Sequence, residues 1–345
     1  TAVTRVNAEH IWFRLLGPIP PPYQRSYDIS VHSRGTELIG RDLLRVMGEG
    51  PADGDSDADS DFDSDSDNDI DDSGFPDADV DADADEDMNT PLGDFGPPIP
   101  VSELNTGFGE DDPTLTGNML EIYFNRGDNI YVATRSSLAE PFGEAVLAAD
   151  ICSSREESTP EITDDGLTLF FNSERPGGLG DSDIYFTTRT SLLDFWAPPI
   201  HLPVLSTAND DNSPTPTPDA LVLYLVSIRS DGMGSQDIYV ASRARRSDSW
   251  SAPVLVPNIN SRDRDTNPHL SRDGLTLYFT TSRDGDSDIW RAVRSSPSAD
   301  FDAPEPVPEL NTNDGDADPW ISPDGRVIYF SSNRNGDYDL FMAVR

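Results

Sequence analysis

Residues 318–341 read DPWISPDGRVIYFSSNRNGDYDLF, and this stretch decides the fold. It holds a proline preceded by Asp, a Pro-Asp-Gly turn, an apolar run typical of a strand, a polar loop and a second apolar run. The first proline, Pro319, has counterparts at Pro113, Pro160, Pro214 and Pro268, spaced by 47, 54, 54 and 51 residues. The chain therefore contains five copies of one unit.

Each unit is predicted to supply four short strands joined by turns. The apolar run after the turn occupies residues 120–124, 167–171, 221–225, 275–279 and 327–330. The next strand begins at Asn129, Asp183, Asp237, Asp288 and Asp339, and a Pro-containing segment closes each unit. Four strands per unit, without helical periodicity, predict an all-β, five-bladed β-propeller with four antiparallel strands per blade over residues 93–345.

The two ends of this region indicate how the ring closes. The last unit stops at Arg345, after its third strand. Residues 96–106 (GPPIPVSELNT) closely match residues 303–312 (APEPVPELNT), which provide the fourth strand of the preceding unit. We therefore expect the strand at residues 99–104 to complete the last blade and pair with residues 339–344.

Residues 318–341 and the segment SRDGLTLYFTTSR at residues 271–283 resemble the repeat of the TolB-like propellers, a WD-like family of bacterial cell-envelope proteins. The first copy departs most, with Thr116-Gly-Asn in place of the turn. The resemblance implies a protein of the cell envelope, in the periplasm or at the outer surface, or a secreted one. It also implies that the propeller binds other proteins.

The N-terminal part of the chain matches nothing in the repeats. Residues 1–50 receive no fold assignment, and no signal peptide is visible in them. Residues 51–92 are predicted to be a disordered acidic linker of Asp, Ser and Ala, because residues 51–90 carry 18 carboxylates and no basic residue.

Charge and composition exclude several classes of partner. The chain has 64 acidic and 24 basic residues, all of the latter Arg, for a net charge of −40. Nucleic acid is not an expected partner, since phosphate binding needs clustered positive charge. No apolar run is long enough to insert into a membrane. With the single cysteine Cys152 there is no internal disulfide, and we expect a monomeric propeller.

The candidate binding residues are those that differ between the five copies, because a site that exists once breaks the symmetry. The residue after each motif proline is expected to line the central channel: Thr114, Glu161, Thr215, His269 and Trp320. Repeated residues, such as the loop arginines Arg126, Arg175, Arg229, Arg283 and Arg334, are expected to form structural ion pairs and hydrogen bonds. The channel residues could equally plug the channel without binding anything.

A second candidate surface is an acidic face, formed where each blade's first strand is entered. Its proposed members are Asp111, Asp112, Asp210, Asp211, Asp314, Asp316 and Asp318. Such a face would steer a basic partner or collect divalent cations weakly. No cofactor is expected, and the identity of any metal stays open; the same carboxylates could also serve only as turn residues.

The sequence carries no recognised catalytic motif. Glycoside hydrolysis needs two acids in the channel, and the column after the motif prolines offers only Glu161. We therefore expect a non-catalytic binding scaffold that takes a protein or a small ligand through one face or the channel. The alternative is a glycan-acting hydrolase or lyase with its site in the channel, for which two or more carboxylates must converge there.

Overall fold

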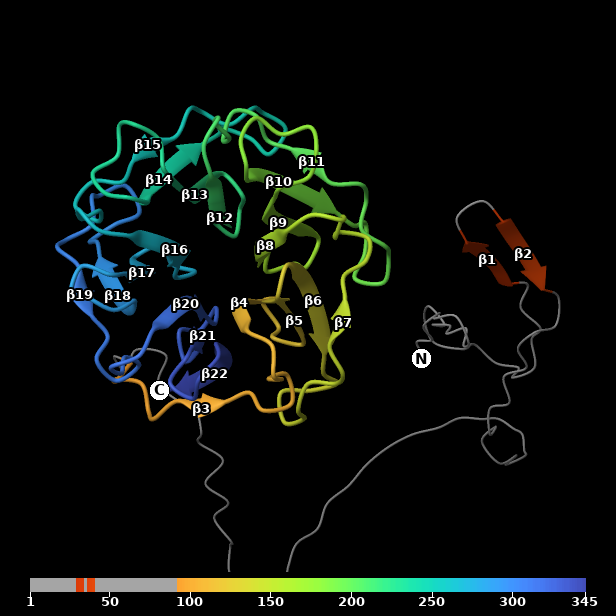
Figure 1. The fold of residues 1–345 in the computed structure, drawn as a ribbon, viewed down its shortest axis with the longest axis horizontal. Coiled ribbons are helices and arrows are strands. Elements are labelled where there is room, and N and C mark those ends of the chain that lie inside the picture. The colour runs from red at the N-terminus through yellow and green to blue at the C-terminus, as the bar shows by residue number, and fades with distance from the viewer. Residues whose placement is uncertain (1–28, 34–35, 41–91) are drawn as a thin grey trace, which may run out of the picture. The chain divides into compact units, whose positions relative to one another are not determined.

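The computed structural model describes residues 29–33, 36–40 and 92–345. Over residues 92–345 the chain forms five four-stranded antiparallel sheets, which stand around a central channel as the blades of a propeller (Figure 1). Every regular element in the described part of the chain is a strand. The five-bladed, all-β propeller predicted from the repeats is confirmed.

The blades are numbered in chain order, and each is given from its inner to its outer strand. Blade 1 comprises β4 (Glu110–Leu115), β5 (Glu121–Arg126), β6 (Asn129–Thr134) and β7 (Val146–Leu147). Blade 2 comprises β8 (Glu157–Ile162), β9 (Thr168–Ser173), β10 (Asp183–Thr188) and β11 (Ile200–His201). Blade 3 comprises β12 (Asp211–Pro216), β13 (Val222–Ser227), β14 (Asp237–Ser242) and β15 (Val254–Leu255). Blade 4 comprises β16 (Asp265–Leu270), β17 (Thr276–Thr281), β18 (Asp288–Val293) and β19 (Glu305–Pro306). Blade 5 comprises β20 (Asp316–Ile321), β21 (Val327–Ser332), β22 (Asp339–Val344) and β3 (Ile99–Pro100).

The N-terminal segment, to which the sequence assigned no fold, contains one hairpin. Its strands β1 (Ile29–Ser33) and β2 (Thr36–Gly40) pair antiparallel. This hairpin is a sheet of its own and is not one of the five blades. The predicted acidic linker lies outside the described residues, except for its last residue, Leu92.

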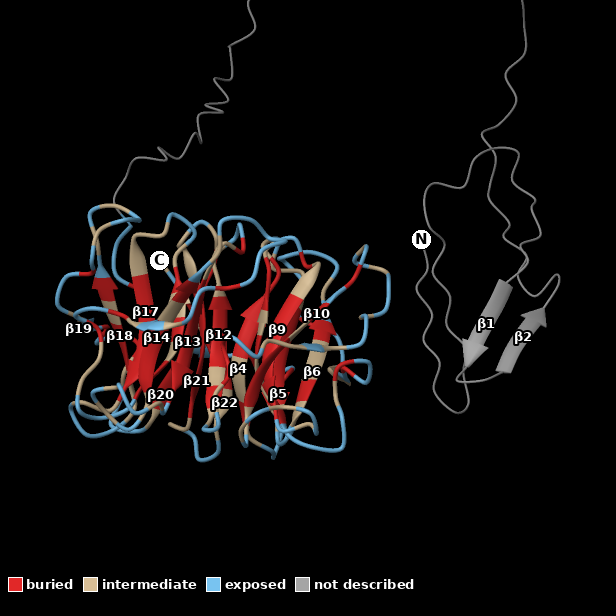
Figure 2. Cartoon of the chain, turned by 90° about the horizontal axis from the view of Figure 1, so that it is seen from above, coloured by how far each residue is buried: buried red, intermediate tan, exposed pale blue. Residues whose placement is uncertain are grey.

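The hydrophobic core lies between the blades. Each of five clusters of buried side chains combines residues of two neighbouring blades. Tyr224 of blade 3, for example, packs in one cluster with Leu277 and Phe279 of blade 4. The second strand of each blade is therefore covered on both faces, which explains its continuous apolar run. In Figure 2 the strands are largely buried, while the exposed residues gather in the loops at their ends.

The first and last blades are joined as the sequence predicted. In β3, Ile99 lies opposite Met342 and Pro100 opposite Phe341 of β22. Beyond β3, the Asn105 side chain brackets Leu340: its Nδ2 donates to the Leu340 carbonyl at 3.0 Å, and its Oδ1 accepts from the Leu340 N–H at 2.8 Å. The N-terminal end of the propeller thus supplies the outer strand of blade 5 and closes the ring.

The loop arginines form the same buried ion pair in every blade. Each contacts the carboxylate that begins its own blade's inner strand, at 2.5 to 3.0 Å: Arg126–Glu110, Arg175–Glu157, Arg229–Asp211, Arg283–Asp265 and Arg334–Asp316. The five carboxylate side chains are 0% exposed. Each arginine also donates to a backbone carbonyl of the segment arriving from the preceding blade, such as Leu310 for Arg334. These repeated residues therefore fasten successive blades together.

Candidate functional site: the channel mouth

The inner strands approach the channel through a repeated irregularity. In each, the residue before the motif proline has a positive φ, between 45° and 57°: Asp112, Thr159, Ser213, Asn267 and Asp318. The register with the second strand shifts at this point in all five blades, forming a β-bulge. Proline has no N–H to donate to the ladder, so the pairing breaks there. The bulge brings the residue before each proline to the channel, together with the residue after it in most blades.

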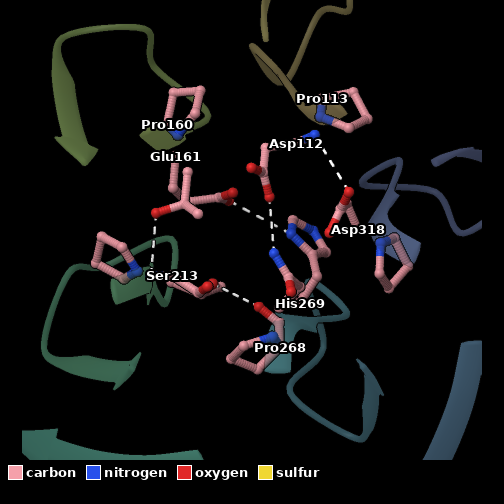
Figure 3. Close-up of a pocket in the computed structure, with 13 residues that line it drawn as sticks. Asp112, Pro113, Pro160, Glu161, Ser213, Pro268, His269 and Asp318 are labelled. Atoms are coloured by element: carbon pink, nitrogen blue, oxygen red, sulfur yellow. Dashed lines mark hydrogen bonds and ion pairs between the residues drawn. The ribbon is translucent and has the colours of Figure 1, made fainter. Parts of the chain in front are cut away.

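The channel is narrow. At the mouth, a cavity of about 30 Å³ is lined by the prolines and the residues flanking them (Figure 3). A second cavity, also of about 30 Å³, lies farther along and is lined by Trp320, Arg272 and Asp164 among others. Glu161 and His269 line both cavities. Each cavity has room for about one water molecule or one small polar group.

The predicted channel residues fall into two groups. Thr114 and Thr215 are buried and hydrogen-bond a neighbouring blade: Thr114 Oγ1 accepts from the Ile162 N–H at 3.2 Å, and the Thr215 hydroxyl donates to the Pro268 carbonyl. Both threonines therefore link blades, although Thr215 also borders the cavity at the mouth.

The other three predicted residues meet in the channel. His269 Nδ1 lies 3.4 Å from Glu161 Oε1, and the two side chains point toward each other in Figure 3. The His269 ring lies 5.8 Å, centroid to centroid, from the ring of Trp320. Trp320 is only 3% exposed, so it forms a wall of the channel rather than a free aromatic surface.

Two further carboxylates line the mouth, those of Asp112 and Asp318, which the sequence analysis assigned to the acidic face. Asp112 and Asp318 lie in adjoining blades, and the Asp112 backbone N–H donates to Asp318 Oδ2 at 3.4 Å. Asn267 Nδ2 donates to Asp112 Oδ1 at 2.7 Å, and Asn125 Nδ2 donates to Asp112 Oδ2 at 3.1 Å. The mouth therefore holds three carboxylates, counting Glu161, where one was expected.

Burial and mutual repulsion change how these acids titrate. Burial, followed by the Asp318 and Asp111 carboxylates, raises the pKa of Asp112 well above its ordinary value. Burial likewise raises the pKa of Asp318, opposed by a hydrogen bond from Ser331. Burial and the charge of Asp318 raise the pKa of the neighbouring Asp111 to about 8. Near neutral pH this corner of the mouth therefore retains protons.

The remaining acidic-face candidates differ in exposure. Asp314 is exposed, and Asp111 and Asp210 are half-buried. Asp211 and Asp316 are completely buried in the ion pairs with Arg229 and Arg334, so they contribute no charge to a surface. The sequence pattern gave no warning, because an acid that starts an inner strand looks the same whether it faces solvent or an arginine. Within residues 92–345 and the described hairpin, no group of three or more His, Cys, Asp or Glu is arranged to hold a metal ion.

The residues before the motif prolines are the part of the site that the sequence reasoning missed as a group. Three of the five are Asp or Asn, which tolerate positive φ better than most residues. That preference, at the same place in repeated units, is the signal that could have revealed the bulge. None of the described segments contains a helix long and apolar enough to cross a membrane.

Comparison with known proteins shows the fold. Neither a protein-family model nor a curated protein matches the chain. Among solved structures, an endo-arabinase from Bacteroides thetaiotaomicron has a TM-score of 0.52 at 14% identity, covering 72% of this chain and 96% of that one. A protein assigned as TolB from Agrobacterium tumefaciens has a TM-score of 0.45 at 20% identity, covering 68% and 76%. TolB from Acinetobacter baumannii has a TM-score of 0.44 at 14% identity, covering 70% of this chain and 55% of that one. The likeness to the endo-arabinase is one of overall fold.

Proposed function

We propose that the propeller is a non-catalytic binding domain that receives a small cationic group of its partner at the channel mouth. The observation that carries the proposal is the convergence of Asp112, Asp318 and Glu161 on one narrow opening. Asp112 and Asp318 lie together and are partly shielded from water, and such carboxylates repel one another unless a proton or a cation lies between them. A primary ammonium group is a compact cation with three donors, and it fits an opening of about 30 Å³.

An unpartnered acceptor beside these carboxylates supports the same proposal. Asn125 is 4% exposed, and its Oδ1 has no hydrogen-bond partner in the described structure. Its Nδ2 already donates to Asp112. A buried amide oxygen without a donor costs about 1–3 kcal/mol, which a donor brought by a ligand recovers. The mouth thus presents acceptors in excess of donors.

The volume of the channel favours binding over catalysis. Sites that enclose a small-molecule substrate usually have about 300–1,000 Å³. The two channel cavities have about 30 Å³ each. A lysine side chain or the N-terminus of a peptide can insert one group into such an opening while the rest of the partner lies on the face around it. Asp210 and Asp314 would then border the partner and steer it by charge.

The rival function is a glycan-acting hydrolase or lyase in the channel. Three carboxylates at the mouth meet the requirement for at least two acids, which is the specific observation in its favour. A sugar ring, however, does not fit a cavity of about 30 Å³ without opening the inner strands. Release of reducing sugar from a panel of soluble glycans, abolished by Glu161→Gln, would establish the enzyme instead.

Location and partner class follow from the TolB-like repeat. The resemblance favours the cell envelope or the outside of the cell, and a protein or small ligand as the partner. The strong negative charge favours a basic partner over nucleic acid. No cofactor is part of this proposal; weak divalent cation binding at the same carboxylates would be competitive with an amine.

The amine can be tested with matched probes. Nα-acetyl-lysine-methylamide and the corresponding norleucine amide differ only in the ammonium group. We expect the lysine probe alone to bind, in the millimolar range, which corresponds to about −4 kcal/mol. Binding should be read from chemical shifts of the Asn125 and Asn267 side-chain amides, and it should be lost in Asp318→Asn. Asp314→Asn, an exposed acid outside the mouth, is the matched control. Equal shifts with both probes, or none, would reject the cationic group.

A further inference from the structure

The five blade interfaces share an arrangement on the side where the third strands end. An arginine follows each third strand and lies over an aromatic ring of its own blade: Arg135 over Phe142, Arg189 over Trp196, Arg243 over Trp250, Arg294 over Phe301 and Arg345 over Phe95. The Nε of each donates to a backbone carbonyl of the turn before its second strand. The rest of the guanidinium points toward the preceding blade.

In four interfaces the preceding blade supplies a partner for this guanidinium. Arg345 Nη2 donates to the Tyr278 hydroxyl at 3.2 Å. Burial raises the pKa of Tyr224 and of Tyr329, and the nearby guanidinium groups of Arg294 and Arg135, respectively, oppose this rise. Arg189 forms an ion pair with Glu121, two residues before Tyr123. The tyrosine is the third residue of the second strand in all four cases.

The interface between blades 2 and 3 breaks this pattern. The third residue of β9 is Phe170, which has no hydroxyl to offer Arg243. The Nη atoms of Arg243 donate no hydrogen bond to any described residue, and its Nε contacts Ala220 O at 2.9 Å. Burial lowers the pKa of Arg243, and the charge of nearby Arg246 lowers it further, against a smaller opposing effect of Asp248. Arg243 thus lacks the tyrosine hydroxyl or carboxylate that the preceding blade places near each of its four counterparts.

A cavity lies where the tyrosine hydroxyl is missing. It has a volume of about 500 Å³; its charged lining residues are Arg243, Arg246 and Asp248, and Phe170, Phe186, Leu202 and Trp250 form apolar walls. Arg246 also donates to two backbone carbonyls, from Nε to Asp219 at 2.8 Å and from Nη2 to Pro218 at 3.1 Å. This volume is in the range of small-molecule sites. The neighbouring interface, between blades 3 and 4, has a similar cavity of about 530 Å³, but both Arg294 and the tyrosine Tyr224 line it. The two cavities differ in the residue that faces the arginine, which is Phe170 in one and Tyr224 in the other. The cavity between blades 3 and 4 can therefore serve as an internal control.

We propose that the cavity between blades 2 and 3 binds an apolar carboxylate, whose anionic end is held by Arg243 and Arg246 and whose body packs on Phe170, Phe186 and Trp250. A guanidinium with free Nη atoms matches the two oxygens of a carboxylate. Two arginines against one acid, Asp248, give this lining a net positive charge in a chain of net charge −40, and with the apolar walls they favour this ligand class. A free arylalkyl or alkyl acid and the C-terminus of a peptide ending in an apolar residue present the same chemistry.

The test uses the full chain and calorimetric titration with 4-phenylbutyrate, against the neutral 4-phenylbutanamide. We expect only the acid to bind. Arg243→Gln should weaken it at least about tenfold, the loss expected for one charge-assisted hydrogen bond. Arg294→Gln, at the same position in the next blade, should change the affinity less than about twofold. A peptide ending in Gly-Phe with a free carboxylate, compared with its amide, shows which of the two sources the cavity prefers.

Phe170→Tyr is the sharper variant, because it restores the residue present in the other four blades. Its hydroxyl should occupy Arg243, weaken the acid at least about fivefold and leave thermal stability unchanged or higher. Equal binding of acid and amide, no binding of either acid, or equal losses in Arg243→Gln and Arg294→Gln would overturn the proposal. Retained tight binding in Phe170→Tyr would overturn it as well.

Discussion

Asp112 and Asp318 stand 206 residues apart in sequence and meet at the seam between the first and last blades, where the Asp112 N–H donates to Asp318 Oδ2 at 3.4 Å. The same seam is closed on its outer side by β3 pairing with β22. Two half-buried acids therefore repel each other where the ring of blades is joined. The stability of the ring and the charge of the channel mouth are coupled through this pair.

This coupling predicts a stability that falls as pH rises. The pKa of Asp111 is raised to about 8, and those of Asp112 and Asp318 are also raised, whereas an unfolded Asp titrates near about 4. The folded state therefore binds more protons between these values. Its extra stability is complete below about pH 4 and lost as pH passes about 8. Asp112→Asn removes the repulsion, so its melting temperature should exceed that of the wild type by roughly 3 °C at pH 9 and by less at pH 6. Parallel curves for the two proteins would contradict this.

Removal of the closing strand β3 should lower the stability of the fold more than truncation of a chain terminus usually does. A chain starting at residue 107 lacks β3, the bracket that Asn105 makes with Leu340, and the buried residues Val101 and Leu104. We expect its melting temperature to be about 10 °C or more below that of a chain starting at residue 91, since large buried side chains contribute about 1.5–3 kcal/mol each. Differential scanning calorimetry of the two chains decides the matter; equal melting temperatures would show that ring closure adds no stability.

The repeated ion pairs should be far more sensitive than exposed ones. Arg283→Met leaves the Asp265 carboxylate, which is 0% exposed, without its charge partner, and should lower the free energy of unfolding by about 3–5 kcal/mol. Arg291→Met in the same blade breaks an ion pair with Glu305, whose side chain is 58% exposed, and should cost at most about 1 kcal/mol. Urea denaturation at pH 7 measures both. Similar losses in the two variants would mean that burial does not set the strength of these pairs.

Substitution of the three acids at the start of blade 5 should have three different effects. Asp316→Asn weakens the ion pair with Arg334 and should mainly destabilise the fold. Asp318→Asn should mainly change amine binding at the mouth. Asp314→Asn, which is exposed, should change only the salt dependence of association with a basic partner. Binding affinities and melting temperatures of the three single variants, measured at low and high salt, distinguish these three effects. An equal loss of binding in all three variants would instead support a continuous acidic binding face.

Much of the fold was predictable because the repeats can be recognised in the amino-acid sequence alone. The five motif prolines, the turns after them and the match between residues 96–106 and 303–312 define the blades and the closing strand. Repetition also identified the loop arginines as structural. It did not identify their partners, since Asp211 and Asp316 carry nothing in their local sequence that separates a buried acid from an exposed one.

Position in the repeat predicted only some of the residues that meet in the channel. Glu161, His269 and Trp320 meet in the channel as their place after the motif proline suggested, but Thr114 and Thr215 hydrogen-bond neighbouring blades. Asp112 and Asp318 were predicted as members of the acidic face, and the bulge with its positive φ places them in the lining of the channel mouth. The positive φ before each motif proline produces this placement, and strand propensities do not predict it.

The sequence by itself determined that this protein is a closed ring of five blades, because a repeated pattern of turns and apolar runs dictates each sheet and a matched terminal strand completes the last one. Only the tertiary structure decided which side chains lie together: Asp112 with Asp318 at the seam, and Arg243 opposite Phe170 at an interface without a hydroxyl. Such contacts join different blades. Their distances depend on how the sheets pack around the channel, and no local stretch of sequence encodes that packing.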